Sequence, residues 1–150
     1  MSNDLEDGLN IRTDDIVWMK NGKIHREDGP AIHHFLGYFA WYFEGKRHRL
    51  DGPAIIWHDG SMEWFVHGSR HREDGPAVIY FQGDREHWIK GQLHREDGPA
   101  VECIDGVKEF WINGQPLTEE EFNQWTAKKE LNDKLHTNLE EKSSHKINKI

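Results

Sequence analysis

A heptapeptide, His-Arg-x-Asp-Gly-Pro-Ala, occurs four times in this sequence, and it places an imidazole, a guanidinium and a carboxylate close together. The copies begin at His25, His48, His71 and His94. A histidine beside an aspartate could ligate a metal ion, or it could act as a general base that the carboxylate orients. Either chemistry would require the reacting groups to converge on one point.

The spacing of the copies argues against one shared site. The aspartates are Asp28, Asp51, Asp74 and Asp97, and like the histidines they recur every 23 residues. If each copy contributes two strands, equivalent histidines lie about 10 Å apart, because neighbouring strands are about 4.8 Å apart. Metal ligands all lie about 2 to 2.3 Å from the ion, so one ion could not bind the column, and one His with one Asp is too few ligands for a separate site. We therefore interpret each histidine as a packing and hydrogen-bonding group at a turn.

The arginines of the same heptapeptide have a similar interpretation. They are Arg26, Arg49, Arg72 and Arg95. We expect each to form an ion pair with Asp or Glu of its own copy or the next. No nucleophile constellation is visible elsewhere, since Cys103 stands alone in a strand column with His34, Trp57 and Tyr80, and no glycine opens a helix as in a phosphate-binding loop. The sequence predicts a protein that is not an enzyme and has no metal site and no cofactor.

One copy of the repeat predicts two short strands. Trp64 to Val66 is aromatic or β-branched and leads into His67-Gly68, a turn signal in which glycine supplies positive φ. Asp74-Gly75-Pro76 predicts a second bend, and Ala77 to Phe81 the next strand. Four stacked copies predict a mainly β fold: an antiparallel β-meander built from 23-residue β-hairpin repeats, with a C-terminal α-helical cap.

Tryptophans follow almost the same period. They are Trp18, Trp41, Trp64, Trp88 and Trp111. The step from Trp64 to Trp88 is one residue too long, and we interpret this as an insertion in one turn that a deletion in the next turn balances. Beside these tryptophans lie Met19, Tyr42, Phe65, Ile89 and Ile112.

Both faces of the predicted sheet carry apolar side chains. Ile55 and Val78 are each followed by another aliphatic residue, Ile56 and Ile79, and adjacent strand residues point to opposite faces. Something must cover the second face: curling of the sheet, the C-terminal segment, another subunit or a partner. The partner-binding candidates on the sheet are Tyr42, Phe65, Ile56 and Ile79.

A helix is predicted after the last repeat. Thr118 and Glu121 form a capping-box pattern, and Phe122 and Trp125 share a helix face that could close the open end of the sheet. A second stripe lies on a different side of a straight helix, and a break at residues 126–129 would reconcile the two stripes. The stripe consists of Leu131, Leu135 and Leu139, which could fold back on the sheet, dimerise or bind a partner.

These elements divide the chain into four segments. They are an N-terminal extension (1–15), four full repeats with one partial repeat (16–117), one helix or two short helices (118–142) and a flexible tail (143–150). We expect the first ten or so residues to be loosely ordered.

Composition restricts the partners. The formal net charge is -8 with both signs interspersed, which disfavours nucleic acid because sequence-independent binding needs a basic surface. The longest apolar runs are far shorter than a membrane span, and the acidic start is unlike a secretion signal, so we expect a cytoplasmic protein without membrane contact. A homo-oligomer could form through the sheet edge or the C-terminal helix.

The 23-residue period, together with the NG of WMKNG and WING and the WYFEG segment, resembles MORN-type repeats and, more closely, the YwqK-type antitoxin variant. Residues 16–125 resemble still more the phage, giant-virus and bacterial proteins built from W-x-x-N-G-x-x-H-R-x-D-G-P-A units, which often end in an LTEEEF-type helix. The resemblance implies β-hairpin repeats used as interaction surfaces and a phage or mobile-element origin. It implies no reaction.

We therefore predict a protein-binding module, with a host or defence factor as the partner if the chain is phage-encoded. Two alternatives stay open. One is a protein that sequesters a small ligand or nucleotide, with the Arg and His columns gripping phosphate and Trp or Tyr stacking on a base. The other is a structural component of the virion.

Overall fold

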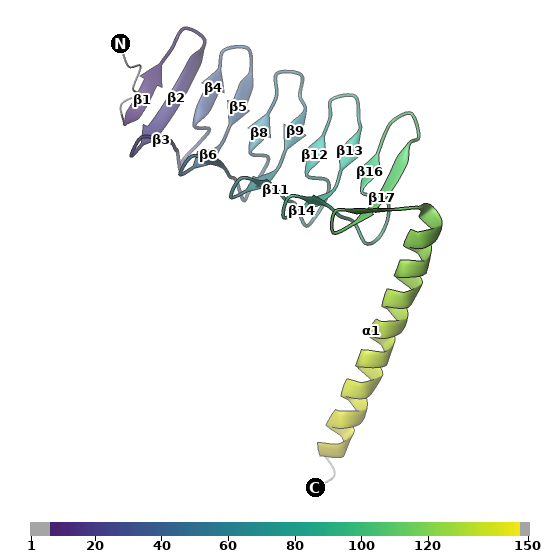
Figure 1. Ribbon diagram of the computed structural model, residues 1–150. Coiled ribbons are helices and arrows are strands. Elements are labelled where there is room, and N and C mark those ends of the chain that lie inside the picture. Colours follow the sequence, from purple (N-terminus) through teal and green to yellow (C-terminus); the bar gives the residue numbers. More distant parts are fainter. Residues whose placement is uncertain (1–6, 148–150) are drawn as a thin grey trace.

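The computed structural model describes residues 7–147, with side chains as far as residue 140, and it shows one long sheet followed by one helix (Figure 1). In chain order the strands are β1 (Gly8–Ile11), β2 (Asp15–Lys20), β3 (Lys23–Ile24), β4 (Ile32–His34), β5 (Tyr38–Ala40), β6 (Tyr42–Phe43), β7 (Lys46–Arg47), β8 (Ile55–Ile56), β9 (Met62–Glu63), β10 (Phe65–Val66), β11 (Ser69–Arg70), β12 (Val78–Ile79), β13 (Arg85–Glu86), β14 (Trp88–Ile89), β15 (Gln92–Leu93), β16 (Val101–Glu102), β17 (Lys108–Ile112) and β18 (Gln115–Leu117). The helix α1 spans Glu119–Ile147. The predicted fold class is confirmed.

Each repeat contributes two hairpins. The long ones form the main sheet, in the order β1-β2-β4-β5-β8-β9-β12-β13-β16-β17-β18, with β3 paired to β2. The short hairpins β6-β7, β10-β11 and β14-β15 form a row along one side of that sheet (Figure 1). All paired strands are antiparallel, and the sheet is open, because its order begins with β1 and ends with β18.

The short hairpins turn on two successive left-handed residues. Glu44 and Gly45 have φ of 48° and 79°, and His67 and Gly68 have 48° and 88°. A two-residue turn with both φ positive matches the twist of the flanking strands. The positive φ predicted for Gly68 is confirmed. The residue before the glycine is also left-handed, which is unfavourable for a bulky side chain.

The register of these hairpins corrects the assignment of two tryptophans. Phe65 pairs with Arg70 and Trp88 with Leu93, so Trp88 occupies the position of Phe65, and Trp111 does the same in the last unit. The turn glycines Gly22, Gly45, Gly68, Gly91 and Gly114 follow one another at 23 residues without interruption. The predicted insertion and deletion are therefore wrong. Aromatic residues occupy two adjacent columns, and tryptophan moves from one column to the other at Trp88.

The two faces of the sheet carry different side chains. On the first, here called the Ile55 face, Ile55 and Val78 are fully buried, and Ile55 clusters with Ala40, Ala54 and Phe65. By strand alternation the opposite face, here called the Trp41 face, carries Trp41, Ile56 and Ile79, which are half-buried. The prediction of apolar side chains on both faces is confirmed.

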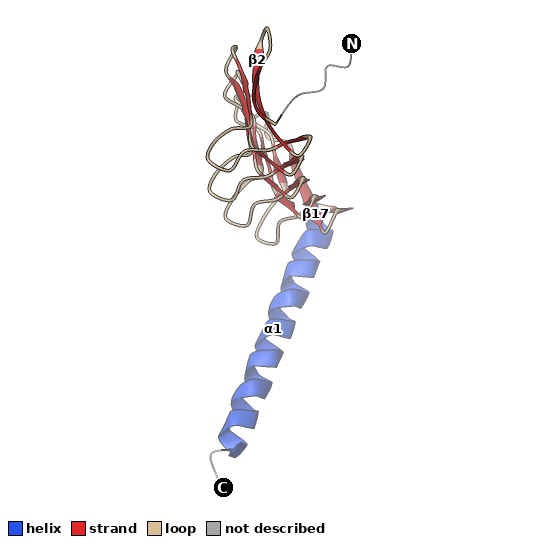
Figure 2. Ribbon diagram, turned by 90° about the vertical axis from the view of Figure 1, so that its left-hand side faces the viewer, coloured by secondary structure: helices blue, strands red, loops and turns tan. Residues whose placement is uncertain are grey.

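Both ends of the chain differ from their predictions. β1 lies within the predicted extension and pairs with β2, Leu9 opposite Trp18, so this segment is part of the sheet. α1 is one uninterrupted helix, which is the first of the two predicted alternatives and has no break at residues 126–129, and 143–147 of the predicted tail are helical. Residues 148–150 lie outside the described residues. The helix points away from the sheet and leaves its faces uncovered (Figure 2).

The start of α1 closes the last unit as predicted. The Glu121 N–H donates to Thr118 Oγ1 at 3.2 Å, and the Thr118 N–H donates to Glu121 Oε2 at 2.8 Å. Phe122 is 6% exposed and its ring lies 4.8 Å from that of Phe110, which has the position of Trp41 in the last unit. Lys129 forms an ion pair with Glu96 of the fourth heptapeptide. No helix in the described part of the chain is long and apolar enough to cross a membrane.

Candidate binding face

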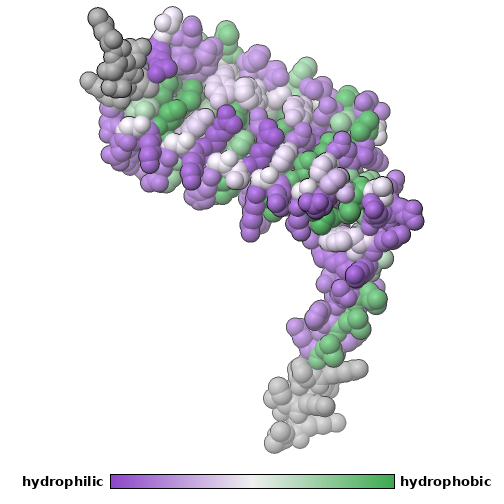
Figure 3. Space-filling model, in the orientation of Figure 1, coloured by the Kyte–Doolittle hydropathy of each residue, from purple (hydrophilic) through white to green (hydrophobic). Residues whose placement is uncertain are grey.

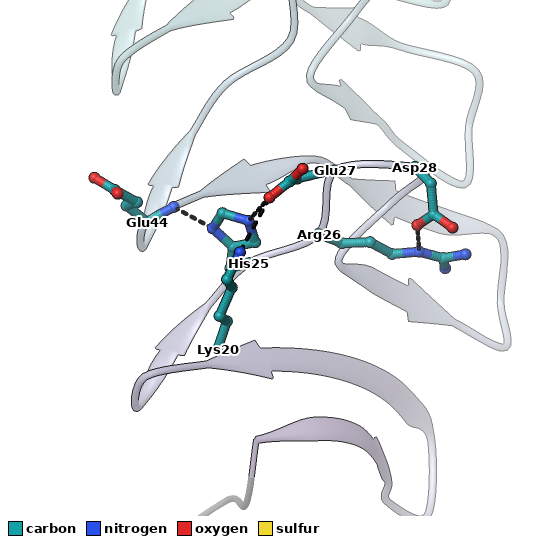
Figure 4. Close-up of polar contacts among 6 residues, drawn as sticks. All are labelled: Lys20, His25, Arg26, Glu27, Asp28 and Glu44. Carbon is teal, nitrogen blue, oxygen red and sulfur yellow. Dashed lines mark hydrogen bonds and ion pairs between the residues drawn. The ribbon is translucent and has the colours of Figure 1, made fainter.

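The histidine of each heptapeptide bonds its unit to the next. His25 Nδ1 accepts a hydrogen bond from the Glu44 backbone N–H at 3.0 Å (Figure 4). The other three units repeat this bond: His48 with His67 at 3.0 Å, His71 with Lys90 at 3.1 Å and His94 with Asn113 at 3.0 Å. Every donor is the left-handed residue of the following turn, so each histidine helps to hold that strained turn in place. Acceptance at Nδ1 assigns the proton of the neutral ring to Nε2.

The arginine of each heptapeptide bonds to the aspartate and the proline carbonyl of the same heptapeptide and so holds that segment as a loop. Arg26 Nε donates to Asp28 at 2.7 Å and Nη1 to the Pro30 carbonyl at 3.3 Å, while the guanidinium stacks on Trp18 with Cζ 4.0 Å from the ring centroid. Arg49 and Arg72 make the same bonds and stack on Trp41 and Trp64. The arginine hydrogen bond lowers the pKa of each loop aspartate. The predicted ion pairs within each copy are confirmed.

The loops leave three clefts of the same construction between them. Their volumes are about 580, 620 and 770 Å³. The lining includes the heptapeptide arginines and aspartates, which already pair with one another. Within the described residues, no group of three or more His, Cys, Asp or Glu side chains could hold a metal ion.

The Ile55 face carries a polar network above its apolar core. Glu63 is 8% exposed and accepts hydrogen bonds from Trp57 Nε1 and Arg70 Nε, both at 2.9 Å. Glu86 accepts from Trp88 Nε1 at 2.7 Å and from the Tyr80 hydroxyl at 3.0 Å. Burial and then the bond to Glu86 raise the pKa of Tyr80 to about 12, so this hydroxyl remains a donor at neutral pH.

Aromatic rings and guanidinium groups alternate along the short hairpins on this face. The aromatic–arginine row consists of Tyr42, Arg47, Phe65, Arg70 and Trp88. Arg47 Nε donates to the Tyr42 hydroxyl at 3.3 Å, and its Cζ lies 5.3 Å from the Phe65 ring centroid. The Arg70 Cζ lies 6.0 Å from the Phe65 centroid and 5.2 Å from that of Trp88. An open pocket of about 400 Å³ lies over the row, lined by Arg47, Phe65, Gly68, Ser69, Arg70, Trp88 and Gly91.

The two arginines of the row differ in their partners. Arg70 Nη2 lies 2.8 Å from Glu63 Oε2, and Nη1 lies 3.9 Å from Glu86. Arg47 forms no ion pair with any of the described residues. The sequence gives the reason, because Ala40 stands seven residues before Arg47 where Glu63 stands seven residues before Arg70.

The structure separates the partner-binding residues predicted from the sequence. Tyr42 is half-buried within the row, whereas Phe65 is only 6% exposed, and its ring takes part in the core and in two cation–π contacts. Ile56 and Ile79 lie half-buried on the opposite face. Leu131, Leu135 and Leu139 are 52–63% exposed, and apolar atoms line one side of the helix (Figure 3). The candidates thus lie on three separate surfaces.

Sequence reasoning missed Arg47, Arg70 and Trp57 as members of one surface. A signal was present seven residues before each of the two arginines, where Ala40 precedes Arg47 and Glu63 precedes Arg70. The alanine marks the arginine without a carboxylate.

A second apolar row lies at the tips of the long hairpins. Phe35, Phe81 and Ile104 recur at multiples of 23 residues and are 57%, 68% and 73% exposed. His58 interrupts the row in the second of these hairpins. The tips therefore do not form one continuous apolar patch.

No protein-family model matches the chain, and no curated protein matches it.

Proposed function

We propose that this chain is a non-enzymatic protein-binding module and that the aromatic–arginine row is its contact surface. The observation that carries the proposal is the open pocket on an uncovered sheet face, which Arg47, Arg70 and Trp88 line. Tyr42 extends the row at its Arg47 end, where its hydroxyl accepts from Arg47 Nε. Tyrosine, tryptophan and arginine are the residues that most often dominate binding energy at protein interfaces. The row crosses three successive hairpins, so it offers several anchor points to one partner.

The state of the loop arginines gives less support to a nucleotide-sequestering protein. Arg72 would grip phosphate in that function, but its guanidinium donates to Asp74 and Pro76 and stacks on Trp64. Phosphate would have to displace an existing carboxylate. Arg47, which forms no ion pair with the described residues, lies instead on the Ile55 face.

The repeat resembles that of phage proteins, and we therefore propose a bacterial host or defence factor as the partner. The test is affinity capture from a bacterial lysate, followed by a binding measurement with the purified captured protein. We expect Arg47→Ala to weaken binding at least about tenfold, as expected when an interface anchor is truncated. Lys46→Ala is the matched control, because Lys46 is exposed and lies in the same hairpin beside Arg47, on the other face.

Three results would contradict the proposal. Equal affinity of Arg47→Ala and Lys46→Ala for the partner would show that the aromatic–arginine row is not part of the interface. Loss of binding on replacing Ile56 and Ile79 with serine, with Arg47→Ala unaffected, would place the interface on the Trp41 face. Failure of the folded wild-type chain to bind any protein would exclude the function under the conditions used.

A further inference from the structure

We infer that Arg47 is a receptor for a carboxylate, and that an acidic side chain of the partner supplies it. This inference rests on the proposed function, because it names the chemistry of the partner at the same surface. The Arg47 guanidinium is half-buried over the Phe65 ring and lines an open pocket. It contacts no carboxylate among the described residues.

The next unit along the chain shows which group fits. Arg70 occupies the position equivalent to Arg47, and there Glu63 Oε2 receives Nε at 2.9 Å and Nη2 at 2.8 Å. In the preceding unit the equivalent of Glu63 is Ala40, so the arginine is present but the carboxylate that would pair with it is missing. A partner carboxylate would restore the pair that the neighbouring unit makes within the chain.

Tyr42 adds a second donor to this position. Its hydroxyl oxygen accepts from Arg47 Nε, which leaves the hydroxyl proton available, since it has no acceptor among the described residues. A neutral oxygen satisfies one N–H but does not neutralise the guanidinium charge. Hydrogen bonds between an ionised donor and a carboxylate are about twice as strong as neutral ones. The Nη groups and the Tyr42 O–H can therefore bind one carboxylate together.

The surrounding charge favours a carboxylate over a phosphate. Glu63 and Glu86 lie on the same face, and the whole chain has a formal net charge of -8. One unpaired arginine can balance a single negative charge, whereas a phosphate carrying nearly two charges would meet greater repulsion. Phosphate sites also commonly use several cationic groups, and Arg70 is already held by Glu63.

The test is a titration of the full-length protein with sodium acetate, followed through the side-chain Nε–Hε NMR signals of its arginines. Sodium chloride and sodium phosphate at matched ionic strength are the other arms. Arg47→Gln assigns the Arg47 signal. Arg85 is the internal control, because it is exposed, lies on the Trp41 face and also forms no ion pair with the described residues.

We expect acetate to shift the Arg47 signal saturably and about threefold more than the Arg85 signal, as a preformed two-donor site requires. Ala40→Glu, checked for folding by circular dichroism, should abolish the response because it supplies the missing carboxylate from within. An Arg47 response equal to that of Arg85, or a stronger response to phosphate than to acetate, would overturn the inference. So would an undiminished response in folded Ala40→Glu protein.

No partner is present in this titration, so its failure can be told apart from failure of the proposed function. If Arg47 does not respond to acetate but partner binding still depends on Arg47, the binding surface is supported and the carboxylate inference is wrong. If acetate binds but no protein is captured, the carboxylate receptor is supported and the protein-binding function is wrong.

Discussion

At the residue scale, the heptapeptide histidine acts through an acceptor nitrogen. In all four copies Nδ1 receives the backbone N–H of a residue 19 positions later, and that residue has a left-handed backbone. The loop aspartate beside it pairs with arginine and does not orient the imidazole. The proximity of His and Asp in the sequence therefore arises from two separate structural bonds.

Removing one of these bonds should destabilise the protein measurably. His71→Ala leaves the Lys90 N–H without its side-chain acceptor, and water can partly replace it because Lys90 is exposed. We expect the free energy of unfolding in urea to fall by about 1 kcal/mol, the usual net value of such a bond. His58→Ala, at an exposed hairpin tip, is the control and should change it by less than about 0.5 kcal/mol. Equal effects of the two changes would argue against the inter-unit bond.

Protonation of a heptapeptide histidine should break the equivalent bond, as in the bond from the His67 N–H to His48 Nδ1. Burial and then the nearby His67 ring, 4.3 Å away between centroids, lower the pKa of His48. The folded state then binds fewer protons than the unfolded state, so stability falls as pH drops from about 6.5 towards the lower folded-state pKa. We expect the Tm to decrease between pH 7.5 and 5, and His48→Asn to reduce that decrease. A Tm of the variant that depends on pH as strongly as that of the wild type would exclude His48 as a source.

At the scale of elements, α1 combines two different environments in one helix. Its first turns carry the capping box and Phe122, which covers Phe110 at the position where a loop arginine covers tryptophan in the first three units. Its later turns carry the exposed Leu131, Leu135 and Leu139. The helix need not break, because only the first apolar stripe packs against the sheet.

Phe122 should therefore anchor the helix, whereas the leucine stripe should not affect the stability of the array. Phe122→Ala should lower the free energy of unfolding by about 3 kcal/mol, as for other buried phenylalanines. Leu135→Ala should change it by less than about 0.5 kcal/mol. Chemical denaturation of the two variants, followed by tryptophan fluorescence, checks this. A large effect at Leu135 would show that the stripe packs on something in solution.

At the scale of the whole molecule, each unit contacts mainly its neighbours in the array. The sheet order advances along the chain, apart from β3, and the inter-unit bonds join each repeat to the next. Repeat proteins of this kind have stabilities that approximate a sum over units and their interfaces. The array should therefore tolerate a change in the number of units.

Deleting residues 64–86, one complete unit, should leave a folded protein with a lower Tm and an unchanged type of circular dichroism spectrum. Deleting residues 64–75, about half a unit, removes Phe65 and Arg72 and disrupts the pairing frame, so that chain should not fold cooperatively. Thermal unfolding of both proteins is the measurement. Loss of folding after the complete-unit deletion would contradict the additive description.

The repeat made the architecture predictable, because period, glycine turns and β-branched residues all favoured the same hairpins. The tryptophans alone do not show the exchange at Trp88, because their spacing is equally compatible with an insertion in a turn, whereas the turn glycines keep the 23-residue period. The row around Arg47 was missed for a related reason: its residues come from different hairpins, and only strand register shows that Ala40 and Glu63 are equivalent. The sequence left one helix and two short helices as alternatives, because it does not show whether Leu131, Leu135 and Leu139 pack against the sheet.

The most direct test of the structural role of the heptapeptide is an NMR measurement of scalar coupling across its hydrogen bonds. We expect couplings from the backbone nitrogens of Glu44, His67, Lys90 and Asn113 to Nδ1 of His25, His48, His71 and His94, respectively, at neutral pH. The proton of each imidazole should be on Nε2. Protonated Nδ1 atoms, with no such couplings, would show that these histidines do not accept the inter-unit bonds and would make a chemical role for them plausible again.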